Sequence, residues 1–170
     1  LEQVARAVLA DQRRQKLAYA EQRFLAPSHD LGFSTRALTT LASLYQSASR
    51  PGFLPRLAPS LPRQDPWPLW ERVRELALGP FGAVVTGVDF CFVEEGHPPS
   101  AKAEFFHEVR EHNERHPGRA LALLYHVGES FTDKSLESAV RWVEEAALLG
   151  AHRLGHAIAL GIEPSSLGAH

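Results

Sequence analysis

The sequence has little of what disulfide-bonded, membrane or nucleic-acid-binding proteins rely on. Its 170 residues include one cysteine, Cys91, which excludes an internal disulfide and any cysteine-rich zinc site. No apolar run approaches the roughly 18 residues of a membrane span, and residues 1–16 lack the apolar core of a signal peptide. Lys and Arg total 18 against 20 Asp and Glu, so no basic excess favours a phosphate backbone. We therefore expect a cytoplasmic protein with neither a membrane nor a nucleic acid as partner.

The remaining composition, 44% hydrophobic and 22% charged residues, is that of a globular domain. In the first third of the chain the hydrophobic pattern predicts a helix up to Gln15, a strand over 17–25 and a helix capped by Ser34 over 34–47. After residue 68 the pattern alternates: helices over 69–78, 100–114 and 133–149, and apolar strands over 83–92, 121–125 and 152–160. Apolar strands joined by helices are typical of parallel βαβ units, in an open sheet or a barrel.

Residues 51–68 interrupt this regularity. Each proline removes a backbone donor and fixes φ, which disfavours both a helix interior and a central strand. We therefore expect an irregular surface segment here, the one candidate linker in the sequence. The segment holds six prolines: Pro51, Pro55, Pro59, Pro62, Pro66 and Pro68.

Ionisable residues stand at the ends of three consecutive predicted strands. Asp89 lies near the end of the first, His126 follows the second directly, with Glu129 three residues later, and His156 lies in the third. Because the carboxyl ends of parallel strands meet at one rim, we expect these side chains to converge there. A neutral imidazole is a good Zn²⁺ ligand, and a carboxylate beside it can move protons to or from a metal-bound water. This pattern makes His126 a candidate ligand, Glu129 a candidate proton carrier, and His156 a candidate to orient the hydroxide.

Each of these residues also has a structural interpretation. A histidine at a strand end can be a hydrogen-bonded surface residue, and Asp89 can cap a loop or pair with an arginine. Glu21 and Arg23 share one face of a strand, so we expect a buried ion pair between them. Cys91 is expected to be a small buried apolar residue. The other histidines are expected to be solvated: His29, His97, His107, His112, His116, His152 and His170.

Two short motifs resemble those of the adenosine and AMP deaminases of the amidohydrolase superfamily. His126-Val127-Gly128-Glu129 is similar to the family's His-Ala-Gly-Glu, and Arg153-Leu154-Gly155-His156-Ala157 is similar to its Arg-Ile-Gly-His-Gly. Residues 87–90 look like the family's fourth strand and residues 19–27 like its second. The resemblance therefore runs from about residue 17 to 163 and breaks at the proline-rich segment.

The resemblance implies an α/β fold, a (β/α)₈ barrel of the amidohydrolase type, with strands 2 to 6 present here. The implied reaction is the zinc-dependent hydrolytic deamination of adenosine or an adenine nucleotide, with release of ammonia. By the same resemblance His126 binds Zn²⁺, Glu129 protonates the ring nitrogen beside the attacked carbon, and His156 positions the metal-bound hydroxide. Asp89 is assigned to substrate binding.

The sequence departs from the family pattern in ways that keep alternatives open. The family's His-x-His on the first strand and its Asp on the eighth are absent, and Phe92 stands where the family has a glycine. Four or five strands cannot close an eight-stranded barrel, and apolar edges need cover. We therefore expect residues 1–170 to be part of a longer chain, a homo-oligomer or a larger assembly, and to be inactive alone. The alternatives are another cyclic amidine, amide or ester as substrate, or a catalytically degenerate barrel that serves as a scaffold.

Overall fold

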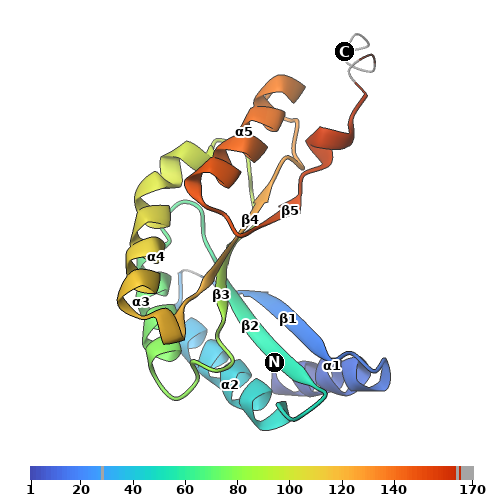
Figure 1. Cartoon of the computed structure of the whole chain (residues 1–170), viewed down its shortest axis with the longest axis vertical. Helices are drawn as coiled ribbons and strands as arrows, with labels where there is room; N and C mark the ends of the chain where they lie inside the picture. The colour runs from blue at the N-terminus through green and yellow to red at the C-terminus, as the bar shows by residue number, and fades with distance from the viewer. Residues whose placement is uncertain (28, 164, 166–170) are drawn as a thin grey trace.

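The computed structural model describes residues 1–27, 29–163 and 165, which form a five-stranded parallel sheet with helices along one side (Figure 1). The strands pair in chain order, β1-β2-β3-β4-β5, and every pairing is parallel. The strands are β1 (Tyr19–Leu25), β2 (Leu54–Leu61), β3 (Gly87–Phe90), β4 (Ala122–Val127) and β5 (Arg153–His156). The α-helices are α1 (Glu2–Arg14), α2 (Leu31–Ala48), α3 (Trp67–Leu78), α4 (Ala103–Arg115) and α5 (Leu136–Leu149). This curved half-barrel confirms the expected partial (β/α) barrel.

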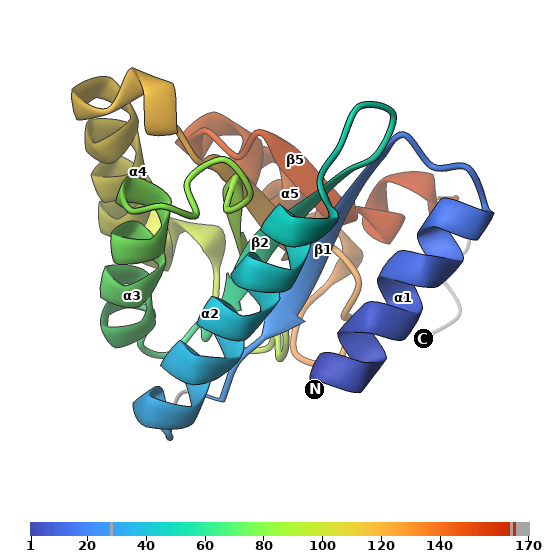
Figure 2. The same ribbon diagram turned by 90° about the horizontal axis from the view of Figure 1, so that it is seen from below.

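The hydrophobic core lies between the sheet and helices α2 to α5, while α1 packs against α2 (Figure 2). Side chains of a strand alternate between its two faces. Phe90 and Tyr125 point to the helices and are fully buried, whereas Asp89 and His126 belong to the opposite face. Phe90 meets the ring of Phe105 edge-on, with ring centroids 5.0 Å apart, a geometry worth about 1 kcal/mol beyond area burial. The same alternation thus fixes the core on one side and the polar residues on the other.

The prediction of an irregular segment over 51–68 is wrong, because β2 is a largely buried strand in the middle of this segment. Successive N–H groups of a strand face opposite neighbours: Leu54 donates to Ala18 beside β1, and Leu57 donates to Val84 on the β3 side. Pro55 and Pro59 lie two residues before and after Leu57, so their missing N–H groups would have pointed toward β3. The N–H groups of β2 that point toward β1 are all present. The ladder to β3 is correspondingly broken into a bridge and a short pairing.

Several smaller predictions are also settled by the structure. Asp30 caps α2 by accepting the N–H of Phe33 at 2.7 Å, whereas Ser34 lies inside the helix and donates to the carbonyl of Pro27. His112 is buried rather than solvated. No helix within the described ranges is long and apolar enough to cross a membrane. The other predicted surface histidines divide as follows: His29, His107, His116 and His152 are exposed, His97 is half-buried, and His170 lies outside the described residues.

Candidate active site

The four residues predicted to converge at the rim, Asp89, His126, Glu129 and His156, do so. Val127 at the end of β4 pairs with His156 at the end of β5, which brings the two strand ends together. The ring centroids of His126 and His156 are 5.1 Å apart, and Nε2 of His156 lies 2.9 Å from Oε2 of Glu129. A carboxylate and an imidazole in this contact can exchange a proton. The spatial prediction is confirmed, while the roles assigned to these residues stay predictions.

The ring of His126 is oriented by a buried carboxylate. Asp89 is fully buried, and its Oδ1 lies 2.9 Å from Nδ1 of His126. The other oxygen of Asp89 accepts the hydroxyl of Ser60 at 3.0 Å. A carboxylate on one ring nitrogen fixes the tautomer and leaves the second nitrogen as a potential metal ligand. Asp89 thus acts on His126 in this structure, and its assignment to substrate binding stays a prediction.

Gly155 explains why the second motif carries a glycine before its histidine. Gly155 is the register partner of His126, and the ring of His126 packs directly on its backbone. A Cβ atom at position 155 would lie 2.7 Å from Cδ2 of His126, closer than any ordinary contact. Only glycine therefore leaves His126 in this position.

Arg23 occupies the second nitrogen of His126. Nη1 of Arg23 lies 2.5 Å from Nε2 of His126. With the ring proton on Nδ1 toward Asp89, Nε2 carries the lone pair and accepts this hydrogen bond. In the part of the chain that the structure describes, no three His, Cys, Asp or Glu side chains gather as a metal site. His126 with Asp89 therefore fits one metal-ligand position, and the described residues do not complete the set.

The expected ion pair between Glu21 and Arg23 is wrong. Glu21 of β1 pairs instead with Arg153 of β5, so the contact joins the two edge strands of the sheet across its hollow face. A cavity of about 320 Å³ lies there, lined by these three side chains together with Leu124 and residues 154–155. The spacing of Glu21 and Arg23 showed that they share one face of the strand. It could not show that the sheet curves enough to bring Arg153 to Glu21.

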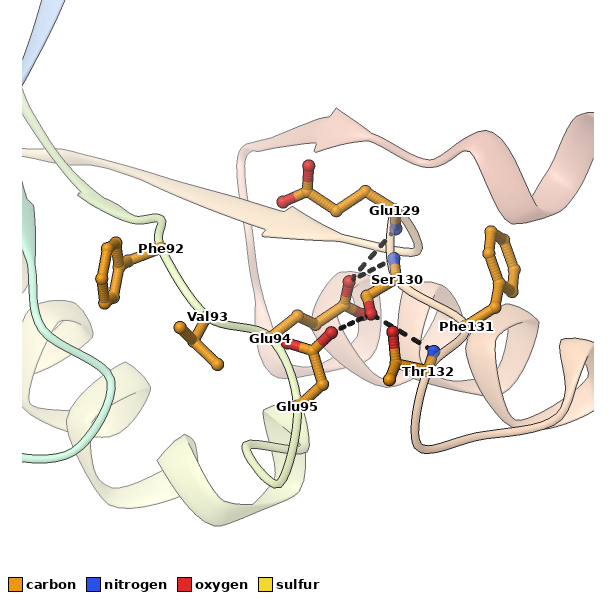
Figure 3. Close-up of a pocket in the computed structure, with 8 residues that line it drawn as sticks. All are labelled: Phe92, Val93, Glu94, Glu95, Glu129, Ser130, Phe131 and Thr132. Carbon is orange, nitrogen blue, oxygen red and sulfur yellow. Dashed lines mark hydrogen bonds between the residues drawn. The ribbon is translucent and has the colours of Figure 1, made fainter.

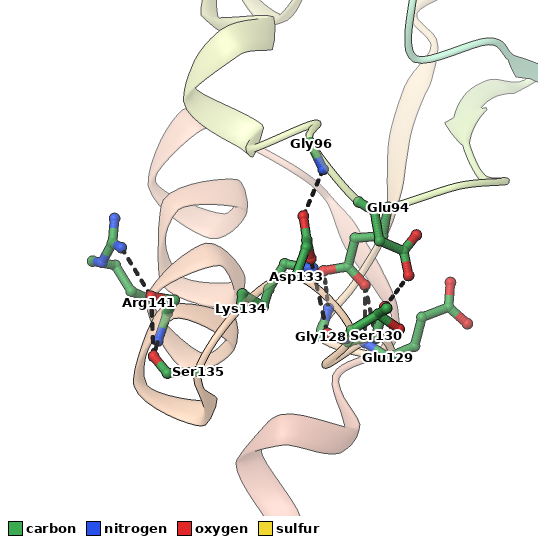
Figure 4. Close-up of polar contacts among 12 residues, drawn as sticks. Glu94, Gly96, Gly128, Glu129, Ser130, Asp133, Lys134, Ser135 and Arg141 are labelled. Carbon is green, nitrogen blue, oxygen red and sulfur yellow. Dashed lines mark hydrogen bonds and ion pairs between the residues drawn. The ribbon is translucent and has the colours of Figure 1, made fainter.

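Glu94 is a functional candidate that the sequence did not single out. Its side chain is 2% exposed, and its carboxylate accepts three backbone N–H groups, from Gly128 at 2.9 Å and from Glu129 and Ser130 at 3.1 Å each (Figure 4). Glu94 thus holds the loop that presents Glu129. Its place just after β3 was the available signal, but nothing in the sequence distinguishes it from the adjacent Glu95.

A pocket of about 350 Å³ lies between the loops that follow β3 and β4, lined by residues 92–95 and 129–132 (Figure 3). Of the four predicted site residues, Glu129 lines it. The hydroxyl of Ser130 donates to Glu95 and lowers the pKa of that carboxyl. At the end of β3, burial raises the pKa of Cys91, which is half-buried. Cys91 is therefore only partly the buried packing residue that was expected.

Comparison with known proteins adds to this geometry. No family model matches the chain. Over 86 residues it is 34% identical to proteins named adenosine deaminase from Mycobacterium tuberculosis, Mycobacterium bovis and Mycobacterium avium. The chain resembles adenosine deaminases. The matched stretch is 51% of this chain and 20% of each relative, so the resemblance covers half of the chain and a fifth of those enzymes.

Solved structures resemble the chain over nearly its whole length. One is an amidohydrolase from Burkholderia ambifaria with bound Zn, at a TM-score of 0.71 and 22% identity over 97% of this chain and 43% of that one. Another is an adenine deaminase from Arthrobacter aurescens, at a TM-score of 0.69 and 18% identity over 96% of this chain and 47% of that one. At these identities the likeness establishes the fold. The chain spans less than half the length of either structure.

Proposed function

We propose that the protein serves the hydrolytic deamination of adenosine or an adenine nucleotide, with Zn²⁺ as cofactor. In this reaction water adds to the ring carbon that bears the amino group, the bond to that amine breaks, and ammonia leaves with the inosine-type product. The observation that carries the proposal is the contact between Glu129 and His156 beside His126, at the carboxyl ends of β4 and β5. The names of the relatives support the same class of chemistry.

Each side chain at the rim has a distinct task in this reaction. Glu129 holds a proton and delivers it to the ring nitrogen next to the attacked carbon. His156, within hydrogen-bond distance of Glu129, orients the attacking water and stabilises charge on it. Asp89 fixes the tautomer of His126 so that Nε2 carries the lone pair, which would bind the metal once the side chain of Arg23 has moved away. Zn²⁺ bound there would supply a water whose pKa is lowered to about 7.

The direct test is substrate turnover by the intact gene product. Metal content and ammonia release are measured with adenosine, AMP, ATP and adenine. We expect bound zinc and ammonia from at least one of these compounds. Zinc-loaded protein that releases ammonia from none of them would contradict the proposal.

Glu129→Gln tests the proton-transfer role. The amide keeps the size of the side chain but cannot carry the proton, so turnover should fall by about 10²- to 10⁴-fold with zinc content unchanged. Glu137→Gln on the exposed face of α5 is the matched control and should leave both unchanged. Turnover of Glu129→Gln near that of the wild type removes the proposed role.

A second candidate is a catalytically degenerate barrel that serves as a scaffold. The observation that favours it is Arg23, whose guanidinium takes the lone pair of His126 that a metal would need. On this hypothesis the intact protein holds no zinc, and His126→Ala changes neither metal content nor ammonia release. Zinc that is present in the wild type and lost in His126→Ala excludes it.

A further inference from the structure

Phe92 stands in a backbone conformation that aromatic residues avoid. Its φ is +80°, in the left-handed region where glycine is the usual residue. In the described residues four non-glycine positions have positive φ: Lys16, Phe92, His156 and Ala157. Three of the four lie at or just past the carboxyl ends of β3 and β5, at the rim that carries the candidate active site. Such strain persists only where the surroundings impose it, and it clusters at functional sites.

The side chain of Phe92 is unusually open for a large apolar group. It is 64% exposed and lines the pocket of about 350 Å³. Figure 3 draws Phe92 and Phe131 on opposite sides of this pocket, with Glu129 between them. An aromatic ring that is mostly exposed and held in a strained conformation at a pocket wall buries little of its own area. It offers a face to something that enters the pocket.

The other groups that line the pocket indicate the chemistry of its ligand. They include three carboxylates, Glu94, Glu95 and Glu129, and neither lysine nor arginine. Glu94 is already occupied by three backbone N–H groups, which leaves Glu129 and Glu95 facing the space. Carboxylates accept hydrogen bonds from ring N–H and amino groups, and they repel phosphate.

We propose that Phe92 is a stacking platform for a planar, nitrogen-bearing aromatic ring, and that the pocket takes an unphosphorylated base or nucleoside rather than a nucleotide. The ring lies against the face of Phe92 while its ring nitrogen accepts the proton of the Glu129 carboxyl. This inference rests on the proposed deaminase function and narrows its substrate class. Phe92 is then a residue for binding and specificity, and the proton transfer belongs to Glu129.

The test measures adenosine and AMP binding to the intact protein by calorimetry, together with the thermal midpoint of each variant. Phe92→Gly should weaken adenosine binding by about 5- to 100-fold, because the stacking face is lost. Its thermal midpoint should stay level or rise by a few degrees, since glycine relieves the positive φ. Phe92→Leu keeps the strain and loses the ring face, so it should also bind weakly. Phe92→Tyr should bind adenosine like the wild type, and AMP should bind the wild type more weakly than adenosine.

The outcomes separate this inference from the proposed reaction. Equal adenosine binding by the wild type and Phe92→Gly, or no binding by the wild type, overturns the platform. AMP binding as tight as that of adenosine overturns the preference for an unphosphorylated ligand. If adenosine binds the wild type, binds Phe92→Gly more weakly and yields no ammonia, stacking on Phe92 is supported and the proposed deamination is contradicted. If Phe92→Gly releases ammonia with the same KM as the wild type, stacking on Phe92 is contradicted and the proposed deamination is supported.

Discussion

The loop that presents Glu129 is fixed mainly by one side chain, because the carboxylate of Glu94 accepts three of its backbone N–H groups. Glu94→Gln keeps the shape of this side chain but turns one acceptor oxygen into an amide donor that faces backbone N–H groups. A lost buried hydrogen bond of this kind costs about 1–3 kcal/mol. We expect faster amide hydrogen exchange at positions 128–130 and a lower kcat, with exchange in the core of the sheet unchanged.

The neighbouring Glu95 provides the control for this experiment. Its carboxylate accepts the hydroxyl of Ser130 and touches none of the three backbone donors, so Glu95→Gln should leave their exchange rates unchanged. Equal exchange rates in the wild type and Glu94→Gln would show that the carboxylate does not hold the loop.

Which site residues the sequence could predict depends on how local their signal is. His126, Glu129 and His156 stand at strand ends within short motifs, and the hydrophobic pattern places the strands. Arg63 could not be found this way. It is fully buried and donates to the carbonyl of His126 at 2.5 Å, across a separation of 63 residues. The hydrogen bond from Arg23 to His126 is likewise long-range. Such contacts depend on how the strands are placed, which no local pattern encodes.

At the scale of whole elements, β2 shows where counting residue types fails. Six prolines in 51–68 predicted irregularity, yet the decisive quantity is the direction in which each missing N–H would have pointed. Pro55 and Pro59 sit four residues apart and weaken only the ladder toward β3. Pro66 and Pro68 flank Trp67 at the start of α3, where a missing donor costs nothing. The pattern placed the other four strands, but β3 and β5 are each four residues long and lie inside the longer predicted ranges 83–92 and 152–160.

The junction of α3 and α4 should weaken in acid through His112. This histidine is buried edge-on against Trp70, with ring centroids 5.5 Å apart, and burial lowers its pKa from the usual 6.5. As pH falls below 6.5 the unfolded chain takes up this proton before the folded chain does, so the free energy of unfolding decreases. We expect His112→Phe to flatten this decrease in urea titrations at pH 7 and pH 5, and His107→Gln on the exposed face of α4 to retain it. A steep decrease that persists in His112→Phe would assign the acid sensitivity to other groups.

The curvature of the whole molecule is visible in one contact. Glu21 and Arg153 lie on the two edge strands and still form an ion pair, which requires the sheet to bend around its polar face. Alternating helices and strands predict parallel units equally well in an open sheet or a barrel, so periodicity alone left the choice open. The family resemblance predicted the barrel, and the structure agrees with it.

The stability of the whole molecule should decline steeply in alkali. Burial raises the pKa of Tyr45 and of Tyr125 from 10.0 to about 12, and both side chains are at most 2% exposed. Between pH 10 and about 12 the unfolded chain releases these two protons while the folded chain keeps them, so the free energy of unfolding falls as pH rises. The loss is on the order of 2 kcal/mol for each tyrosine.

Denaturant unfolding at pH 9 and pH 11.5, with phenolate absorbance recorded in parallel, measures this decline. Tyr45→Phe and Tyr125→Phe should each remove part of it, whereas Tyr19→Phe, at a half-exposed tyrosine on β1, should retain most of it. Tyr45 donates to Gln22 and Tyr125 lies against Arg63, so each variant also needs comparison at pH 7, where the lost contact alone lowers stability. A decline of equal size in the wild type and in both buried-tyrosine variants would mean that other groups set the alkaline limit of the fold.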